Sequence, residues 1–124
     1  YENKSNERAA SGSIYYFVDK DEKTDFHRID CDEYWCYNAG STLELWIITQ
    51  EGNLIIRKCG ITEDAEPTIY IPSGAIFASR HSANTSEGTF ITAITVPRFK
   101  YEGFELFPKN EMIKKYPFVS NFWD

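Results

Sequence analysis

The feature that most constrains the fold is a series of short segments with β-strand composition, separated by turn residues at intervals of roughly ten residues. The first, SIYYFV at 13–18, is rich in β-branched and aromatic residues, and the charged stretch DKDEK follows it. An EGN turn at 51–53 between two apolar segments indicates a hairpin. Because strands joined by short turns run antiparallel, the pattern predicts an all-β sandwich or barrel of antiparallel strands. The expected strands are 13–18, 25–29, 33–38, 42–48, 53–60, 68–71, 75–82, 89–97 and 104–107.

One segment has helical character. KNEMIKKY at 109–116 lies between Pro108 and Pro117, which favours a short helix that begins after the first proline and ends before the second. With 124 residues, of which 42% are hydrophobic, the chain is long enough for one domain with its own core. We expect an N-terminal arm over 1–12, trimmed because it does not begin with Met, and a single domain over 13–124.

Composition excludes several classes of partner. The net charge is −6 and the basic residues are scattered, apart from the Lys114–Lys115 pair, so we expect no nucleic acid. We also expect no membrane, because no apolar run approaches the ~18 residues that a span requires. Three cysteines without a C-x-x-C pair indicate reduced thiols in a cytoplasmic protein, rather than a disulfide framework or a zinc ribbon.

The densest group of chemically active residues is HRIDCDEYWCYNAG at 27–40. His27 and Glu33 in a dry interior can act as a general base and its partner, because a nearby carboxylate favours the charged form of an imidazole. Alternation along a strand places Trp35 and Tyr37 on the same face as Glu33. The stretch therefore indicates the wall of a small-molecule pocket, and the alternative is that its aromatic side chains simply fill the interior.

The same stretch and a later one carry residues at fixed spacing: His27-x-Ile29-x3-Glu33-x6-Gly40 and Pro72-x-Gly74-x2-Phe77. The two patterns resemble the paired motifs of the cupin superfamily, small jelly-roll barrels. In cupins with a metal, two His and one Glu of the first motif and one His of the second converge on one ion. Ile29 and Phe77 stand where two of these histidines would be. The resemblance therefore implies no tight metal site, and at most a weak divalent metal held by His27 and Glu33.

The order of longer segments is also informative: SIYYFV, HRIDCDEYWCYNAGSTLEL, TIYIPSGAIFAS and ITVPRFKYEGFEL, then a short helix ending in Tyr-Pro. This order resembles one uncharacterised cupin-like family, described as dimers without an established chemistry. The resemblance implies a cupin-type antiparallel jelly-roll barrel with a short C-terminal helix, and a homodimer. Family members carry His at the position of Cys36 and Trp-Gln at Ile76-Phe77, so this chain has fewer polar groups.

We therefore expect a pocket for a sugar- or keto-acid-like small molecule inside the barrel, with or without catalysis. A metal-independent isomerase or epimerase would use His27 as base, Glu33 as its partner and Tyr37 as acid. A metal-dependent dioxygenase would need a third ligand, for which His81 is a candidate. The candidate catalytic residues are thus His27, Glu33 and Tyr37, and the candidate ligand contacts are Arg28, Trp35 and Phe77. For Arg28, the alternative is an ion pair on the outer face.

Overall fold

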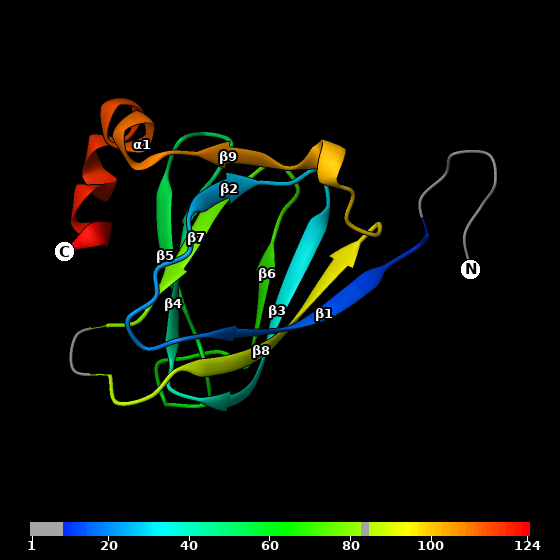
Figure 1. Ribbon diagram of the computed structural model, residues 1–124, viewed down its shortest axis with the longest axis vertical. Coiled ribbons are helices and arrows are strands. Elements are labelled where there is room, and N and C mark those ends of the chain that lie inside the picture. Colours follow the sequence, from blue (N-terminus) through cyan, green and yellow to red (C-terminus); the bar gives the residue numbers. More distant parts are fainter. Residues whose placement is uncertain (1–8, 83–84) are drawn as a thin grey trace.

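A computed structural model describes residues 9–82 and 85–124 (Figure 1). Residues 1–8 lie outside them, so most of the predicted arm over 1–12 is not described. Every strand expected from the sequence is present, with ends that differ by at most two residues. The elements are β1 (Gly12–Val18), β2 (Phe26–Arg28), β3 (Asp32–Gly40), β4 (Leu43–Ile48), β5 (Leu54–Cys59), β6 (Thr68–Ile71), β7 (Ile76–Arg80), β8 (Thr89–Val96), η1 (Tyr101–Gly103), β9 (Glu105–Phe107), α1 (Lys109–Lys115) and η2 (Pro117–Trp123).

The strands form two antiparallel sheets that face each other. One has the order β1-β8-β3-β6 and the other β5-β4-β7-β2-β9. The predicted antiparallel jelly roll with a short C-terminal helix is confirmed, but the two sheets are not closed into a barrel. Within the described residues, each sheet keeps two edge strands that do not pair with the other sheet. They are β1 and β6 in one sheet, and β5 and β9 in the other.

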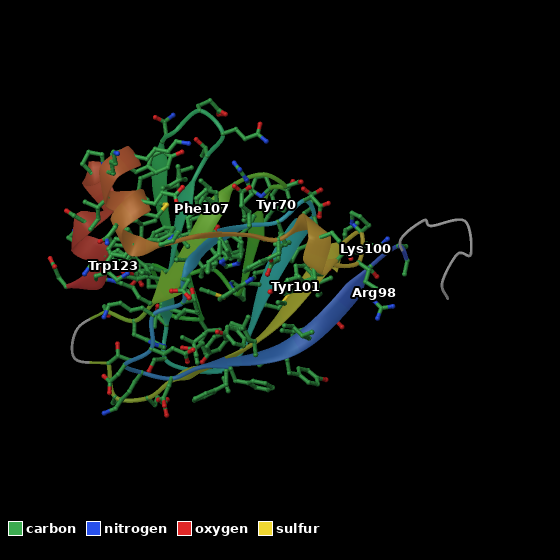
Figure 2. The ribbon with its side chains drawn as sticks, turned by 45° about the horizontal axis from the view of Figure 1, so that its top comes forward. Tyr70, Arg98, Lys100, Tyr101, Phe107 and Trp123 are labelled. Carbon is green, nitrogen blue, oxygen red and sulfur yellow. The ribbon has the colours of Figure 1, made fainter. Side chains whose placement is uncertain are left out.

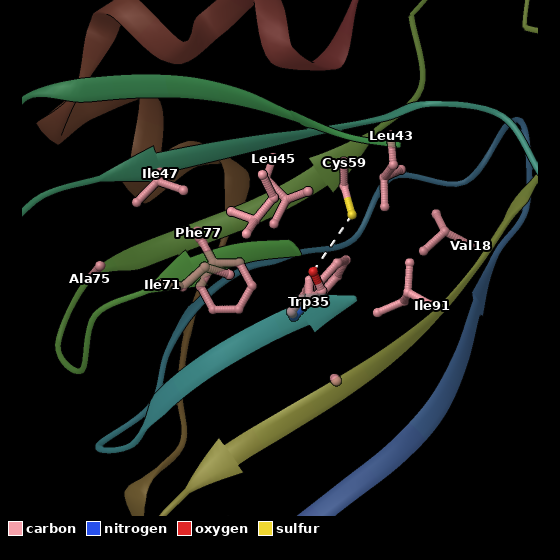
Figure 3. Packing of buried hydrophobic residues seen from close by; sticks show 12 residues of the cluster. Val18, Trp35, Leu43, Leu45, Ile47, Cys59, Ile71, Ala75, Phe77 and Ile91 are labelled. Carbon is pink, nitrogen blue, oxygen red and sulfur yellow. Dashed lines mark hydrogen bonds between the residues drawn. The ribbon is translucent and has the colours of Figure 1, made fainter. Parts of the chain in front are cut away.

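The main core lies between the inner faces of the two sheets (Figure 3). Strict alternation produces it: in β8, Ile91 and Ala93 are buried while Phe90 and Val96 are exposed. The thiol of Cys59 lies 3.7 Å from the carbonyl oxygen of Trp35 and connects the two sheets. The inner layer is thus filled by side chains over most of its length.

A second core lies on the outer face of the β5-β4-β7-β2-β9 sheet, where α1 and η2 cover it (Figure 1). Trp46 and Phe122 pack edge to face across this layer, with ring centroids 5.2 Å apart. The sequence predicted α1 but not η2, because Pro117 was interpreted as the end of helical structure. Burial on both faces explains why β4 and β7 are nearly continuous apolar segments. No helix of the described residues is long and apolar enough to cross a membrane.

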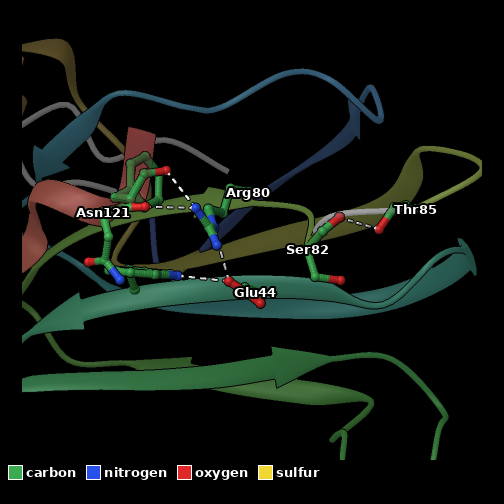
Figure 4. A network of polar contacts seen from close by, with 7 residues as sticks. Glu44, Arg80, Ser82, Thr85 and Asn121 are labelled. Carbon is green, nitrogen blue, oxygen red and sulfur yellow. Dashed lines mark hydrogen bonds and ion pairs between the residues drawn. The ribbon is translucent and has the colours of Figure 1, made fainter. Parts of the chain in front are cut away.

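Arg80 on β7 connects the sheet to the C-terminal residues of η2 (Figure 4). Its Nε donates to Glu44 Oε1 at 3.1 Å, and its Nη1 donates to the carbonyl oxygens of Asn121 at 3.0 Å and Phe122 at 2.9 Å. The guanidinium also lies 5.1 Å above the ring of Trp46. The C-terminal residues are therefore held by directed polar contacts as well as by apolar packing.

Gly40, the last residue of the first motif, has a structural role. Its φ of +99° lies in the left-handed region, and a Cβ there would come within 2.1 Å of the carbonyl oxygen of Gly88. Only glycine satisfies both requirements without moving the backbone. The spacing of the motif is therefore set at this end by the close approach of two chain segments.

Candidate functional site

A cavity of about 400 Å³ opens at the end of the molecule where β1 begins and β8 ends. Its volume is in the range of small-molecule sites. Both sheets contribute to its wall. The apolar lining residues are Ile14, Ile29, Ala93, Phe99 and Phe104, and the polar ones are Ser13, His27, Glu33, Thr95 and Arg98.

His27 lies on β2, with its ring packed against Phe77 at 4.3 Å and stacked on Phe104 at 5.7 Å between centroids. Its Nδ1 is 2.8 Å from the carbonyl oxygen of Asp25. A carbonyl oxygen only accepts, so Nδ1 carries the proton and the lone pair of the neutral ring is on Nε2. Nε2 has no hydrogen-bond partner among the described residues. Burial lowers the pKa of His27, and the contacts with Asp25 offset this only in part, so the ring is neutral at pH 7.

Glu33 comes from the facing sheet, on β3, and is only 7% exposed. Its Oε2 accepts a hydrogen bond of 2.6 Å from Trp35 Nε1. Burial raises the pKa of Glu33 from 4.5 to about 7, and the bond from Trp35 opposes this rise only in part. The carboxyl is therefore divided between its two protonation states near neutral pH. Glu33 was expected to favour the charged form of the His27 imidazole and so to raise its pKa. The pKa of His27 is instead lowered, because burial has the largest effect on that ring.

The other candidate residues lie in different places. Trp35 and Phe77 are buried and support the two cavity residues, Trp35 through its bond to Glu33 and Phe77 through its contact with His27. Tyr37 is on β3 with Glu33 and Trp35, at the spacing that predicts the same face, but its hydroxyl donates to the carbonyl oxygen of Gly40 at 2.6 Å and Tyr37 does not line the cavity. Arg28 pairs with Glu105 at 2.6 Å, which is the outer ion pair given as its alternative.

Residues 1–107 match the family model described as Cupin superfamily (DUF985). The chain belongs to this family. An X-ray structure of a protein from Shewanella oneidensis is similar at 28% identity and a TM-score of 0.85, over 95% of this chain and 75% of that one. A hypothetical protein from Leishmania major is similar at 25% identity and a TM-score of 0.82, over 94% of this chain and 76% of that one. Oxalate decarboxylase from Bacillus subtilis shares the fold at 15% identity, with a TM-score of 0.68 over 92% of this chain and 31% of that one. No protein with a curated description matches.

Sequence reasoning about this cupin missed several cavity residues. Thr95 could have been found, because alternation along 89–97 places it on the inner face with Ile91 and Ala93. Arg98, Phe99 and Phe104 could not have been placed in the same way. They follow the end of β8, where the chain no longer alternates and no residue pattern gives a side chain's direction.

The donor set of this cupin does not fit the metal site that the superfamily motifs imply. Ile29 lines the cavity beside His27 and Glu33, and the ring of Phe77 packs against the imidazole. His81, the candidate third ligand, is buried with its Nε2 at 2.7 Å from Thr89 Oγ1 and is not in the cavity wall. Among residues 9–82 and 85–124, no three His, Cys, Asp or Glu side chains group closely enough to hold a metal ion.

Proposed function

We propose that this cupin binds a small polar metabolite, sugar- or keto-acid-like, and transfers a proton on it without a metal, as an isomerase or epimerase does. The observation that carries the proposal is the pairing of two groups in one cavity: a neutral imidazole with an available lone pair, and a buried carboxyl whose pKa is about 7. Acid–base catalysis works best with groups that titrate near the working pH.

The two groups have complementary roles in this proposal. His27 Nε2 takes a proton from a carbon next to a carbonyl group, while protonated Glu33 donates its proton to the carbonyl oxygen. The product of this step is an enol, with a positive imidazolium and a negative carboxylate in the cavity. The imidazolium then returns a proton to the adjacent carbon or to the opposite face of the same carbon, and an enol O–H gives its proton back to Glu33, which completes an isomerisation or an epimerisation. The hydrogen bond from Trp35 stabilises the carboxylate that forms during the step.

Exchange of substrate hydrogen with solvent tests this proposal directly. Keto acids and reducing sugars incubated with the protein in D₂O should gain deuterium at the carbon next to the carbonyl, as measured by NMR. His27→Gln should reduce the exchange rate by roughly a hundredfold or more, because positioned acid–base groups contribute about that factor. Glu33→Gln should reduce it as well, since the amide of Gln is not acidic enough to protonate a carbonyl oxygen.

His81→Gln is the matched control, because His81 is buried away from the cavity. It should leave the exchange rate within about twofold of the unaltered protein. Exchange that persists in His27→Gln would contradict the proposal. Binding of a metabolite without any exchange would instead identify a binding protein that does not turn its ligand over.

We also propose that the chain forms a homodimer through the outer face of the β1-β8-β3-β6 sheet. Tyr15 and Phe17 are 78% and 54% exposed on that face, and the ring of Tyr15 contacts that of Phe90 at 5.6 Å. Neighbouring exposed aromatic side chains on one sheet face favour a protein partner over solvent. Sedimentation equilibrium at micromolar concentration should give twice the chain mass of 14.4 kDa, and a monomer would contradict the proposal.

We propose the cytoplasm as its location. Cys31, Cys36 and Cys59 all lie in the described residues, and none is in a disulfide. Thiols that remain reduced are typical of proteins from a reducing compartment. The burial of Cys31 and Cys59 also keeps these two thiols from oxidants in solution.

A further inference from the structure

Arg98 differs from the other arginines of the described residues. Each of the other three pairs with a glutamate: Arg28 with Glu105 at 2.6 Å, Arg57 with Glu66 at 3.0 Å, and Arg80 with Glu44 at 3.1 Å. Arg98 has no ion pair with any carboxylate of residues 9–82 and 85–124, although the chain carries an excess of acidic residues. It is also the one cationic side chain in the described wall of the cavity.

The backbone around Arg98 is fixed on both sides. Its N–H donates to the carbonyl oxygen of Ala9 at 3.1 Å, and the next N–H, of Phe99, donates to Thr95 Oγ1 at 3.0 Å. Arg98 is exposed, and the first carbons of its side chain pass beside Gly12 at the start of β1, which has no side chain to block them. A Cβ at Gly12 would lie 3.0 Å from Arg98 Cγ. Figure 2 shows Arg98 at the start of β1, at the same end of the molecule as Tyr101 in η1.

We propose that Arg98 binds the carboxylate of the ligand, so that the cavity selects small 2-keto acids over neutral sugars. A guanidinium matches a carboxylate with two parallel hydrogen bonds, and this one has no competing partner in the described chain. Arg98 is an exposed residue of the wall and Glu33 a buried one, and the wall that they share also contains Ile14, Ile29 and Ala93. These apolar residues suit a short carbon chain whose reactive carbon lies deeper than its carboxylate.

This inference rests on the proposed function and names its substrate class. The test is a titration of the full chain, monitored by NMR, with three compounds. These are 2-oxobutyrate, its neutral isostere 2-oxobutanamide, and glucose as the sugar. The unaltered protein should bind 2-oxobutyrate more tightly than the amide or glucose. Arg98→Gln should weaken the binding of 2-oxobutyrate roughly 10- to 100-fold, which is the range for a charge-assisted hydrogen bond. The affinity for the amide should stay unchanged. Arg98→Lys should recover part of the loss, because it keeps the charge without the fork.

Two further variants separate position from charge. Arg28→Gln removes an equal charge on the outer side of a cavity strand and should leave the affinity for 2-oxobutyrate unchanged. Gly12→Ala keeps Arg98 but displaces its side chain. This variant should weaken the binding of 2-oxobutyrate without changing the affinity for the amide. The inference would be overturned if Arg98→Gln weakened the binding of 2-oxobutyrate and of the amide equally. It would also be overturned if the unaltered protein bound glucose more tightly than 2-oxobutyrate, or did not bind 2-oxobutyrate. If 2-oxobutyrate binds in a way that depends on Arg98 but no deuterium exchange occurs, the proposed proton transfer is wrong and the role of Arg98 stands. If exchange occurs only on glucose, the role of Arg98 is wrong and the proposed proton transfer stands.

Discussion

Replacing Glu33 with Gln should stabilise the protein by about 3 kcal/mol above neutral pH, while removing the acid from the cavity. A pKa that rises from 4.5 to about 7 on folding costs about 1.4 kcal/mol per unit whenever the carboxyl is ionised. Gln has nearly the same shape, stays neutral, and can still accept the hydrogen bond from Trp35 Nε1. The variant therefore removes the cost of a buried charge and keeps the packing.

The sign of the pH dependence follows from proton binding. Between pH 4.5 and about 7 the folded protein holds a proton on Glu33 that the unfolded chain has lost, so stability falls as the pH rises through this window. Above about pH 7 both states are ionised and the difference is constant. Glu33→Gln and the unaltered protein should thus have equal stability near pH 4 and diverge up to pH 7. The lowered pKa values of His27 and His81 affect both proteins alike and largely cancel in the comparison.

Urea unfolding at pH 4.5 and pH 8 measures this difference, and the carboxyl carbon shift of Glu33 in an NMR titration gives its pKa directly. Glu63→Gln, at an exposed position in the loop before β6, is the control and should change stability by less than about 0.5 kcal/mol. Equal stabilities of Glu33→Gln and the unaltered protein at pH 8 would show that the carboxyl is solvated when ionised. A trade of stability for a buried titrating group is typical of functional sites.

The sequence predicted the part of the cavity that regular strands build. Alternation along β3 correctly places Glu33 and Trp35 inside, because successive side chains of a strand point to opposite faces. It could not show that the hydroxyl of Tyr37 would be taken by a carbonyl three residues away, since that depends on the turn at Gly40. Arg98 was missed for a related reason: it follows β8, and its direction is set by contacts with β1 and with Ala9.

Phe122→Ala should produce the largest loss of stability, about 3 to 5 kcal/mol, which is the usual cost of removing a buried phenylalanine ring. Phe122 is fully buried, with its ring 4.8 Å from that of Phe26 and 5.2 Å from that of Trp46. Such a loss is a large fraction of the stability of a typical small domain. Phe118→Ala is the control, because Phe118 is 49% exposed in the same 3₁₀ helix and should cost less than about 1 kcal/mol.

The effect of Phe122→Ala should also reach the cavity, through β2. This strand has three residues: Phe26 faces the C-terminal layer, and the next residue, His27, faces the cavity. A vacancy behind Phe26 loosens the strand that sets the direction of the imidazole, so the exchange rate should fall even where urea curves show the variant folded. Full exchange activity in folded Phe122→Ala would show that β7 and β9, which pair with β2 on either side, position His27 without the C-terminal layer.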